Sequence, residues 1–243
     1  MKKLLNALLL LALAPISISA QVALSEWQYE GFVITKKGKE QGIIWLNGAD
    51  ETPWRLQKQV LFLPQKKYEK AKKLKRKDFE KYSPKEILGY EFEDRLFVSR
   101  KYSAGATVSF KGLATRMFLE VLTNGPAKAL RYYETPPSVG NASYIDEERE
   151  KARNFPTMLI QVGDEKLKSA SSFNFYEFLD DCPVVYEKYE TGGYGFTPRP
   201  REGKKKGLRG LINKALSMTG FDYVPELIAD YNNECGETEE GDN

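Results

Sequence analysis

The chain has 243 residues, with 37 Lys and Arg against 34 Asp and Glu, which gives a formal net charge of +3. A balance this close to neutral singles out no class of partner, neither nucleic acid nor an acidic polymer. The sequence has no histidine and only two cysteines, which excludes Ser-His-Asp and Cys-His catalysis, imidazole metal sites and four-cysteine zinc sites.

The first twenty residues have the pattern of a secretory signal peptide. Two lysines give a positive start, an apolar run extends from Leu4 to Ala14, and small residues lead to Ala20 and the polar Gln21. A membrane anchor is the alternative, but a span takes about 20 apolar residues. We therefore predict cleavage after Ala20 and an exported chain in the periplasm, at the outer membrane or outside the cell. The mature chain would carry 35 basic and 34 acidic residues.

Alternating apolar and polar residues predict β-strands along much of the next 150 residues. Stretches 27–35 and 41–46 form a predicted hairpin around the polar turn at 36–40, and 59–63 is a third strand that ends at Pro64. The remaining predicted strands are 90–92, 96–102, 115–122, 127–133, 157–162 and 165–168.

Residues 65–82 differ in character from the strands around them. Eight of the twelve residues from Lys66 to Lys77 are Lys or Arg. The only apolar stripe is thin, and its members are Tyr68, Ala71, Leu74 and Phe79. We interpret the segment as a solvated helix or a mobile insertion between strands, with a phosphate- or lipid-binding patch as the alternative.

Two segments without strand periodicity follow different patterns. Ser83-Pro84-Lys85-Glu86 is a helix-start pattern, with Gly89 placed to end the short turn. Residues 134–155 contain two adjacent prolines, a glycine and a charged stretch, and they are predicted to form a polar loop.

Beyond residue 170 the apolar period changes from two to 3.6. Asn174 and Glu177 suggest a capping box for a helix whose apolar face is Phe175, Phe178, Leu179 and Cys182. Two further amphipathic helices are predicted at 208–216 and 224–231. The Gly- and Pro-rich stretch 192–207 is predicted to be a flexible loop, and no internal repeat is present.

Strands followed by helices predict an α+β fold: a curved antiparallel β-sheet or partial barrel, followed by a C-terminal helical cap. The predicted organisation is a signal peptide at 1–20, a β-rich domain at 21–170, a helical C-terminal region at 171–235 and a disordered acidic tail at 236–243. No transmembrane span is expected after signal cleavage.

Several short motifs together resemble uncharacterised exported proteins of the Bacteroidota. They are Gly31–Thr35 with Lys37-Gly38, Gln41–Ile44, Tyr82–Tyr90, Asp181–Pro183 and Tyr231–Cys235. The resemblance implies export and a β-rich body with a helical C-terminus. It brings no known activity and no catalytic residues. The basic segment 66–77 and the loop 192–207 are departures from the pattern.

Candidate chemical groups are few. Glu177, Asp180 and Asp181 are the densest carboxylates beside an apolar face, but adjacent helical residues point about 100° apart, so we interpret these acids as solvating a helix end. The stretch 192–195 lacks a dinucleotide-binding spacing and 203–206 lacks a Walker spacing. The sequence therefore predicts no catalytic residue, no cofactor and no metal site.

Basic residues at Lys204–Lys206, Arg209 and Lys214 surround the apolar face of the helix predicted at 208–216. A helix of this kind can lie on an anionic membrane, but a core-packed helix with a basic wet side has the same pattern, and we favour the latter.

Cys182 and Cys235 are predicted to form a disulfide, because an even pair in an oxidising compartment is most simply bridged; two separate thiols are the alternative. The predicted function is a non-enzymatic binding or envelope-associated domain, with another envelope protein or polymer as partner and not nucleic acid. The alternatives are a carboxylate-dependent enzyme acting on an envelope or extracellular polysaccharide, and peripheral membrane association through the basic segments.

Overall fold

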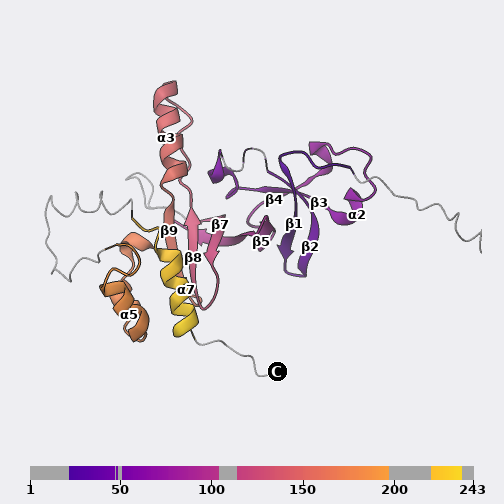
Figure 1. The fold of residues 1–243 in the computed structure, drawn as a ribbon. Coiled ribbons are helices and arrows are strands. Elements are labelled where there is room, and N and C mark those ends of the chain that lie inside the picture. The colour runs from indigo at the N-terminus through magenta and orange to yellow at the C-terminus, as the bar shows by residue number, and fades with distance from the viewer. Residues whose placement is uncertain (1–21, 47, 49–50, 104–113, 197–219, 237–243) are drawn as a thin grey trace, which may run out of the picture.

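The computed structural model describes residues 22–46, 48, 51–103, 114–196 and 220–236, and within them one sheet of ten antiparallel strands dominates (Figure 1). The strand order is β10-β9-β8-β7-β6-β5-β1-β2-β3-β4, so β10 and β4 are its edges and the sheet is open. Helices follow the strands at the C-terminal end. The α+β fold predicted from the sequence is confirmed.

The strands are β1 (Gln28–Thr35), β2 (Gly38–Trp45), β3 (Val60–Pro64), β4 (Glu80–Tyr82), β5 (Gly89–Phe92), β6 (Arg95–Tyr102), β7 (Thr115–Thr123), β8 (Ala127–Tyr132), β9 (Thr157–Val162) and β10 (Lys168–Ser169). The helices are α2 (Gln65–Tyr68), α3 (Ala142–Asn154), α4 (Phe175–Phe178), α5 (Pro183–Glu190) and α7 (Val224–Glu234). Single 3₁₀ turns are η1 (Pro53–Arg55), η2 (Arg76–Asp78) and η3 (Ala170–Ser172).

The first hairpin is tighter than its sequence suggests. Thr35 pairs with Gly38, so only two lysines form the turn, and Gly38 has a φ of +124° that favours glycine. Within the hairpin, Gly42 lies under the ring of Phe62: a Cβ added there would stand 2.7 Å from that ring and 2.2 Å from the Leu63 carbonyl oxygen. The lack of a side chain lets β3 pack at this point.

Two apolar clusters cover different parts of the sheet. The first surrounds β1–β7 and the turn after η1, with Phe62, Tyr90, Phe97 and Phe118 fully buried. The second lies between β7–β9 and the C-terminal helices, where Leu227 and Ile228 of α7 belong to the same cluster as Ala127, Ala129 and Ile160 of the sheet. In Figure 1, α7 lies against β8 and α5 lies outside α7.

Amide side chains from distant segments hold both ends of β8. At its start, Asn232 of α7 accepts from the Ala127 N–H at 2.9 Å and donates to the Ala127 carbonyl at 2.8 Å. Beyond its end, Gln57 accepts from the Tyr133 N–H and donates to the Tyr133 carbonyl, both at 2.7 Å. Each amide thereby satisfies one residue's backbone as a neighbouring strand would.

The predicted polar loop at 134–155 is wrong over 142–154, where the chain forms helix α3. Asn141 caps the helix by accepting from the Tyr144 N–H at 2.9 Å. Ala152 is the one buried residue of α3 and joins a small cluster with Trp54 and Tyr133. A helix that is polar on nearly every side has no apolar period to reveal it. Figure 1 shows α3 projecting away from the sheet.

The helix-start pattern at Ser83 produces a turn and no helix. Glu86 accepts from the Ser83 N–H at 2.7 Å, as a capping box requires, and its own N–H donates to the Ser83 carbonyl. The Leu88 N–H, however, donates to the Ile34 carbonyl at 2.7 Å, and Gly89 begins β5. Pairing with β1 therefore takes the chain into the sheet before a second helical turn can form.

The predicted helix from Phe175 to Cys182 is shorter than expected, and a separate helix that was not predicted follows it. Asn174 caps α4 and donates to Glu177 at 2.8 Å, as expected, but α4 ends at Phe178. Pro183 then starts α5, since proline suits a first helical turn. The last strand is also displaced: Lys168 and Ser169 pair with β9 where 165–168 was predicted.

Helix α7 confirms the helix predicted at 224–231. The predicted signal peptide, the loop from 197, the basic helix at 208–216 and the tail from 237 lie outside the described residues. Within the described ranges no helix combines the length and the apolar character needed to cross a membrane.

Candidate functional site

The two cysteines are joined. Cys182 is fully buried at the start of α5, Cys235 follows α7, and their Cα atoms are 5.8 Å apart in a disulfide that spans 53 positions. The bridge ties the C-terminal end of α7 to the junction of α4 and α5, in agreement with the sequence prediction.

The carboxylates near Cys182 do not form an enclosed pair. Glu177, Asp180 and Asp181 are all exposed. Glu177 accepts from its capping partner Asn174, and Asp181 accepts from the Tyr231 hydroxyl at 3.3 Å. Among the described residues, no group of three His, Cys, Asp or Glu side chains could hold a metal ion. Two of these acids therefore contact helix residues, Glu177 at the start of α4 and Asp181 across to α7.

The start of the glycine-rich stretch packs against α5 and α7. The Tyr194 hydroxyl donates to Asp230 at 2.9 Å, and the Lys188 ammonium lies 2.7 Å from the same carboxylate and 4.3 Å from the centre of the Tyr194 ring. The hydrogen bond from Lys188 lowers the pKa of Asp230, with a smaller contribution from Tyr194. Gly192–Gly195 thus forms a turn that closes on the helices.

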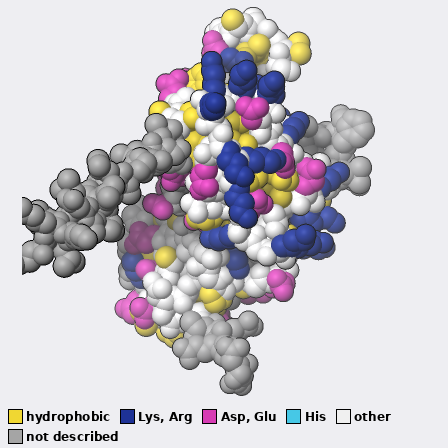
Figure 2. Space-filling view, turned by 90° about the vertical axis from the view of Figure 1, so that its right-hand side faces the viewer, with side chains coloured by type: hydrophobic (Ala, Val, Ile, Leu, Met, Phe, Trp, Pro, Cys, Tyr) yellow, Lys and Arg dark blue, Asp and Glu magenta, His cyan; other side chains and the backbone are white. Residues whose placement is uncertain are grey.

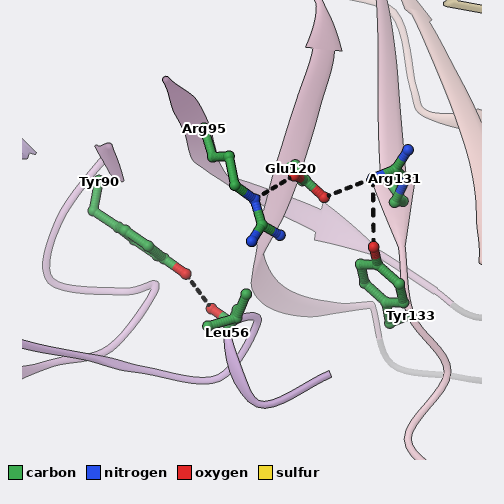
Figure 3. Close-up of polar contacts among 6 residues, drawn as sticks. All are labelled: Leu56, Tyr90, Arg95, Glu120, Arg131 and Tyr133. Carbon is green, nitrogen blue, oxygen red and sulfur yellow. Dashed lines mark hydrogen bonds and ion pairs between the residues drawn. The ribbon is translucent and has the colours of Figure 1, made fainter. Parts of the chain in front are cut away.

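A buried ion cluster was not foreseen from the sequence (Figure 3). Glu120 of β7 is 5% exposed and accepts from Arg95 of β6 at 2.8 Å and from Arg131 of β8 at 3.3 Å. The Arg95 guanidinium also lies 5.4 Å from the centres of two rings, Phe92 and Phe97. The one available clue is that Glu120 stands at an inward position of β7, two residues beyond the buried Phe118.

The cluster links the sheet to the segment after η1. Arg131 also lies 3.4 Å from the Tyr133 hydroxyl, and Tyr133 is the residue whose backbone pairs with Gln57. The Tyr90 hydroxyl, drawn on the left of Figure 3, donates to the Leu56 carbonyl at 2.8 Å. Burial raises the pKa of Tyr90 well above its usual value, so it remains a donor. We interpret this network as structural, because its groups mainly satisfy one another.

A cavity of about 390 Å³ lies beside the segment that follows η1, and its lining is basic. Its lining comprises Trp45, Leu46, Arg55, Leu56, Lys58, Gln59, Leu61 and Arg76. Three of these side chains are cations and none is an acid. Arg55, Lys58 and Arg76 are exposed, and none forms an ion pair with a described residue. We call this the basic pocket.

Most of the pocket lining comes from the ends of β2 and β3 and the chain between them, and Arg76 is the one lining residue from the basic segment. Trp45 ends β2 and meets the Phe79 ring edge-on at 5.1 Å, while Arg76 belongs to η2. Phe79, Tyr68 and Ile43 share an apolar cluster against which Leu74, Val22 and Leu24 also pack. The predicted apolar stripe therefore anchors the basic segment, and its Lys and Arg side chains are exposed. Figure 2 views this end of the molecule and shows Lys and Arg side chains across the middle of the face, with acidic ones interspersed.

Sequence reasoning identified the basic segment but not the pocket. The lining comes from three separate stretches, at 45–46, 55–61 and 76, and only the pairing of β2 with β3 brings the first two together. Comparisons with protein-family models, curated proteins and solved structures found no match. The geometry of this chain therefore carries the functional argument.

Proposed function

We propose that this protein is an exported, non-enzymatic binding domain and that its basic pocket holds an anionic group of an envelope polymer or of another envelope protein. The observation that carries the proposal is the pocket's charge: Arg55, Lys58 and Arg76 line one cavity without an acidic neighbour in the lining. Guanidinium groups bind carboxylate and phosphate through paired N–H donors, which suits them to this task.

Export is supported by three features. The first twenty residues have signal-peptide character, the motifs resemble exported proteins of the Bacteroidota, and the one cysteine pair forms a disulfide. The periplasm, the outer membrane and the cell exterior all fit. Amino-terminal sequencing of protein from an envelope or culture fraction is expected to begin at Gln21. Intact Met1 on purely cytoplasmic protein would contradict export.

The alternative, a carboxylate-dependent enzyme acting on a polysaccharide, calls for two acids facing one cleft. No lining residue of the basic pocket is an acid. Glu177, Asp180 and Asp181 are exposed at the ends of short helices. The pocket therefore favours binding over hydrolysis.

The pocket is tested with glucuronate, a single acidic sugar, added to the mature chain. NMR shifts are expected at the Trp45 indole N–H and at the Nε–H groups of Arg55 and Arg76, with weak, millimolar affinity. The double variant Arg55→Gln/Arg76→Gln should lose these shifts. The matched control is Lys36→Gln/Lys37→Gln, which removes two exposed cations at the opposite end of the β1–β2 hairpin. Unchanged binding by the pocket variant would refute the proposal.

A further inference from the structure

We infer that the ligand of the basic pocket is an acidic polysaccharide several sugars long, and that the basic segment 66–77 is a second contact surface for the same chain. The inference rests on the proposed function, because it specifies what enters the pocket and what lies beside it. It assigns a role to the lysines of this segment that form no ion pair among the described residues.

The basic segment continues directly from the pocket. Arg76 lines the pocket and is also one of the eight Lys and Arg residues between positions 66 and 77. Of those eight, Lys67 alone has an ion pair with a described residue, at 2.6 Å from Glu80. All eight are exposed. Seven of the eight, Arg76 among them, are therefore exposed cations without an ion pair among the described residues.

The segment presents these cations from a fixed base. Tyr68 is buried and its hydroxyl donates to the Val22 carbonyl at 2.6 Å, while Leu74 and Phe79 pack into the cluster beneath β2 and β3. An anchored surface loses less conformational entropy on binding than a free tail does. The unpaired cations also repel one another, and a polyanion lying across them would relieve that repulsion.

The pocket favours sugar over lipid. Trp45 offers an aromatic surface of the kind that packs against the C–H face of a sugar ring, and Gln59 offers an amide for hydroxyl groups. Insertion into a bilayer needs apolar side chains that face outward. The large apolar residues that are exposed among the described residues are Trp27, Leu88, Val139, Tyr144, Phe155 and Val184, and none belongs to the basic segment.

The experiment measures how affinity depends on ligand length. The mature chain is titrated calorimetrically with galacturonate oligomers from one to about ten units and with uncharged dextran as the neutral control. We expect affinity to rise with oligomer length, to fall with added NaCl because exposed charge contacts are screened, and to be absent for dextran.

Two variants separate the pocket from the segment. The variant Lys70→Gln/Lys72→Gln/Lys73→Gln/Lys75→Gln should bind the ten-unit oligomer about tenfold more weakly, since four exposed charge contacts each contribute little, and should bind the monomer unchanged. Its matched control removes four exposed, unpaired lysines elsewhere: Lys36, Lys37, Lys85 and Lys166. Circular dichroism checks that each variant is folded.

The outcomes are distinct. If oligomers of all lengths bind equally and the segment variant binds like the wild type, the inference fails while the pocket proposal stands. If no acidic sugar binds, the proposed function fails as well. Tighter, segment-dependent binding to phosphatidylglycerol vesicles or to single-stranded DNA than to galacturonate oligomers would show that the polysaccharide is the wrong class of ligand.

Discussion

At the scale of single residues, a few polar side chains connect parts of the sheet that lie far apart in the sequence. Gln57 and Asn232 replace missing strand partners at the two ends of β8. Glu120 joins three strands through Arg95 and Arg131, which lie 25 and 11 positions away. Groups like these specify the arrangement of strands because each becomes costly when its partner is absent.

Glu120→Gln should destabilise the fold by about 2–4 kcal/mol. It leaves two arginine charges without their shared carboxylate at a site where Glu120 is buried, although both arginines are partly exposed to water. Urea denaturation measures the change. The control Glu91→Gln breaks the more exposed pair with Lys39 and should cost no more than about 1 kcal/mol. Equal effects of the two variants would contradict a special role for Glu120.

At the scale of elements, the helices differ greatly in how firmly the rest of the fold holds them. Helix α7 packs on β7 and β8 and is bridged by the disulfide. Helix α5 is joined to α7 through Lys188, which pairs with Glu226 at 3.0 Å and Asp230 at 2.7 Å. Helix α3 contributes one buried alanine to a three-residue cluster. Local stability should follow the same ranking.

Helix α3 should therefore open locally more easily than the sheet. Hydrogen–deuterium exchange followed by mass spectrometry is expected to show rapid exchange of amides in 142–154 and slow exchange in β7 and β8. The reason is that few apolar contacts oppose opening of α3, whereas side chains of β7 and β8 belong to two apolar clusters, one with the C-terminal helices and one around Leu119, Leu130 and Leu159. Amides of α3 that exchange as slowly as those of β8 would show that something else covers this helix.

The contact between α5 and α7 should weaken in acid. Lys188 lowers the pKa of Asp230 from its ordinary value of 3.8, so the carboxylate stabilises the folded state above that pH and loses this contribution as the pH falls through the folded-state pKa. Asp230→Asn should lower the melting temperature at pH 7, and its difference from the wild type should shrink between about pH 5 and pH 2.

The matched control for this titration is Asp222→Asn, which removes an exposed carboxylate without an ion pair among the described residues. Its melting temperature should follow that of the wild type across the pH range. A difference between Asp230→Asn and the wild type that stays constant from pH 7 to pH 2 would show that the carboxylate acts through something other than its charge.

At the scale of the whole molecule, the disulfide closes a large covalent loop in the C-terminal part of the chain. It encloses α5 and the chain up to the end of α7, a span of 53 positions. In the chain-entropy account, a loop of this length stabilises the folded state by about 3–5 kcal/mol. Reduction should therefore affect the whole C-terminal layer and not only the two cysteines.

We expect the free energy of unfolding, measured by urea denaturation, to be about 3–5 kcal/mol lower for the reduced protein than for the oxidised protein. The variant Cys182→Ala/Cys235→Ala should show the same decrease. Mass spectrometry of the non-reduced exported protein should find no thiol that alkylates. Two freely alkylated thiols would reject the bridge in the exported protein. A stability that does not respond to reductant would show that the packing and polar contacts of α7 hold it without the bridge.

Local features of the sequence predicted much of the fold. Features that depend on neighbours within one element could be predicted. They are the alternation in β1, β3 and β5–β9, the amphipathic face of α7 and the Asn174–Glu177 cap. The export pattern could be predicted because it lies within the first twenty residues, and the disulfide because the chain has only two cysteines. Polar helix α3 was missed because it lacks an apolar period. The early end of α4 and the separate helix α5, which begins at Pro183, were also missed.

The tertiary structure alone decided which segments meet. The sheet places β5 beside β1 and not beside β4, and this order could not be read from strand periodicity. It also set Glu120 between two arginines and brought 45–46, 55–61 and Arg76 around one cavity. Such sites depend on pairings between segments that are distant in the sequence. The stability of each pairing depends on packing throughout the core and not on the residues of one segment. The sequence by itself therefore predicts a basic segment, and only the folded chain makes part of it the wall of a pocket.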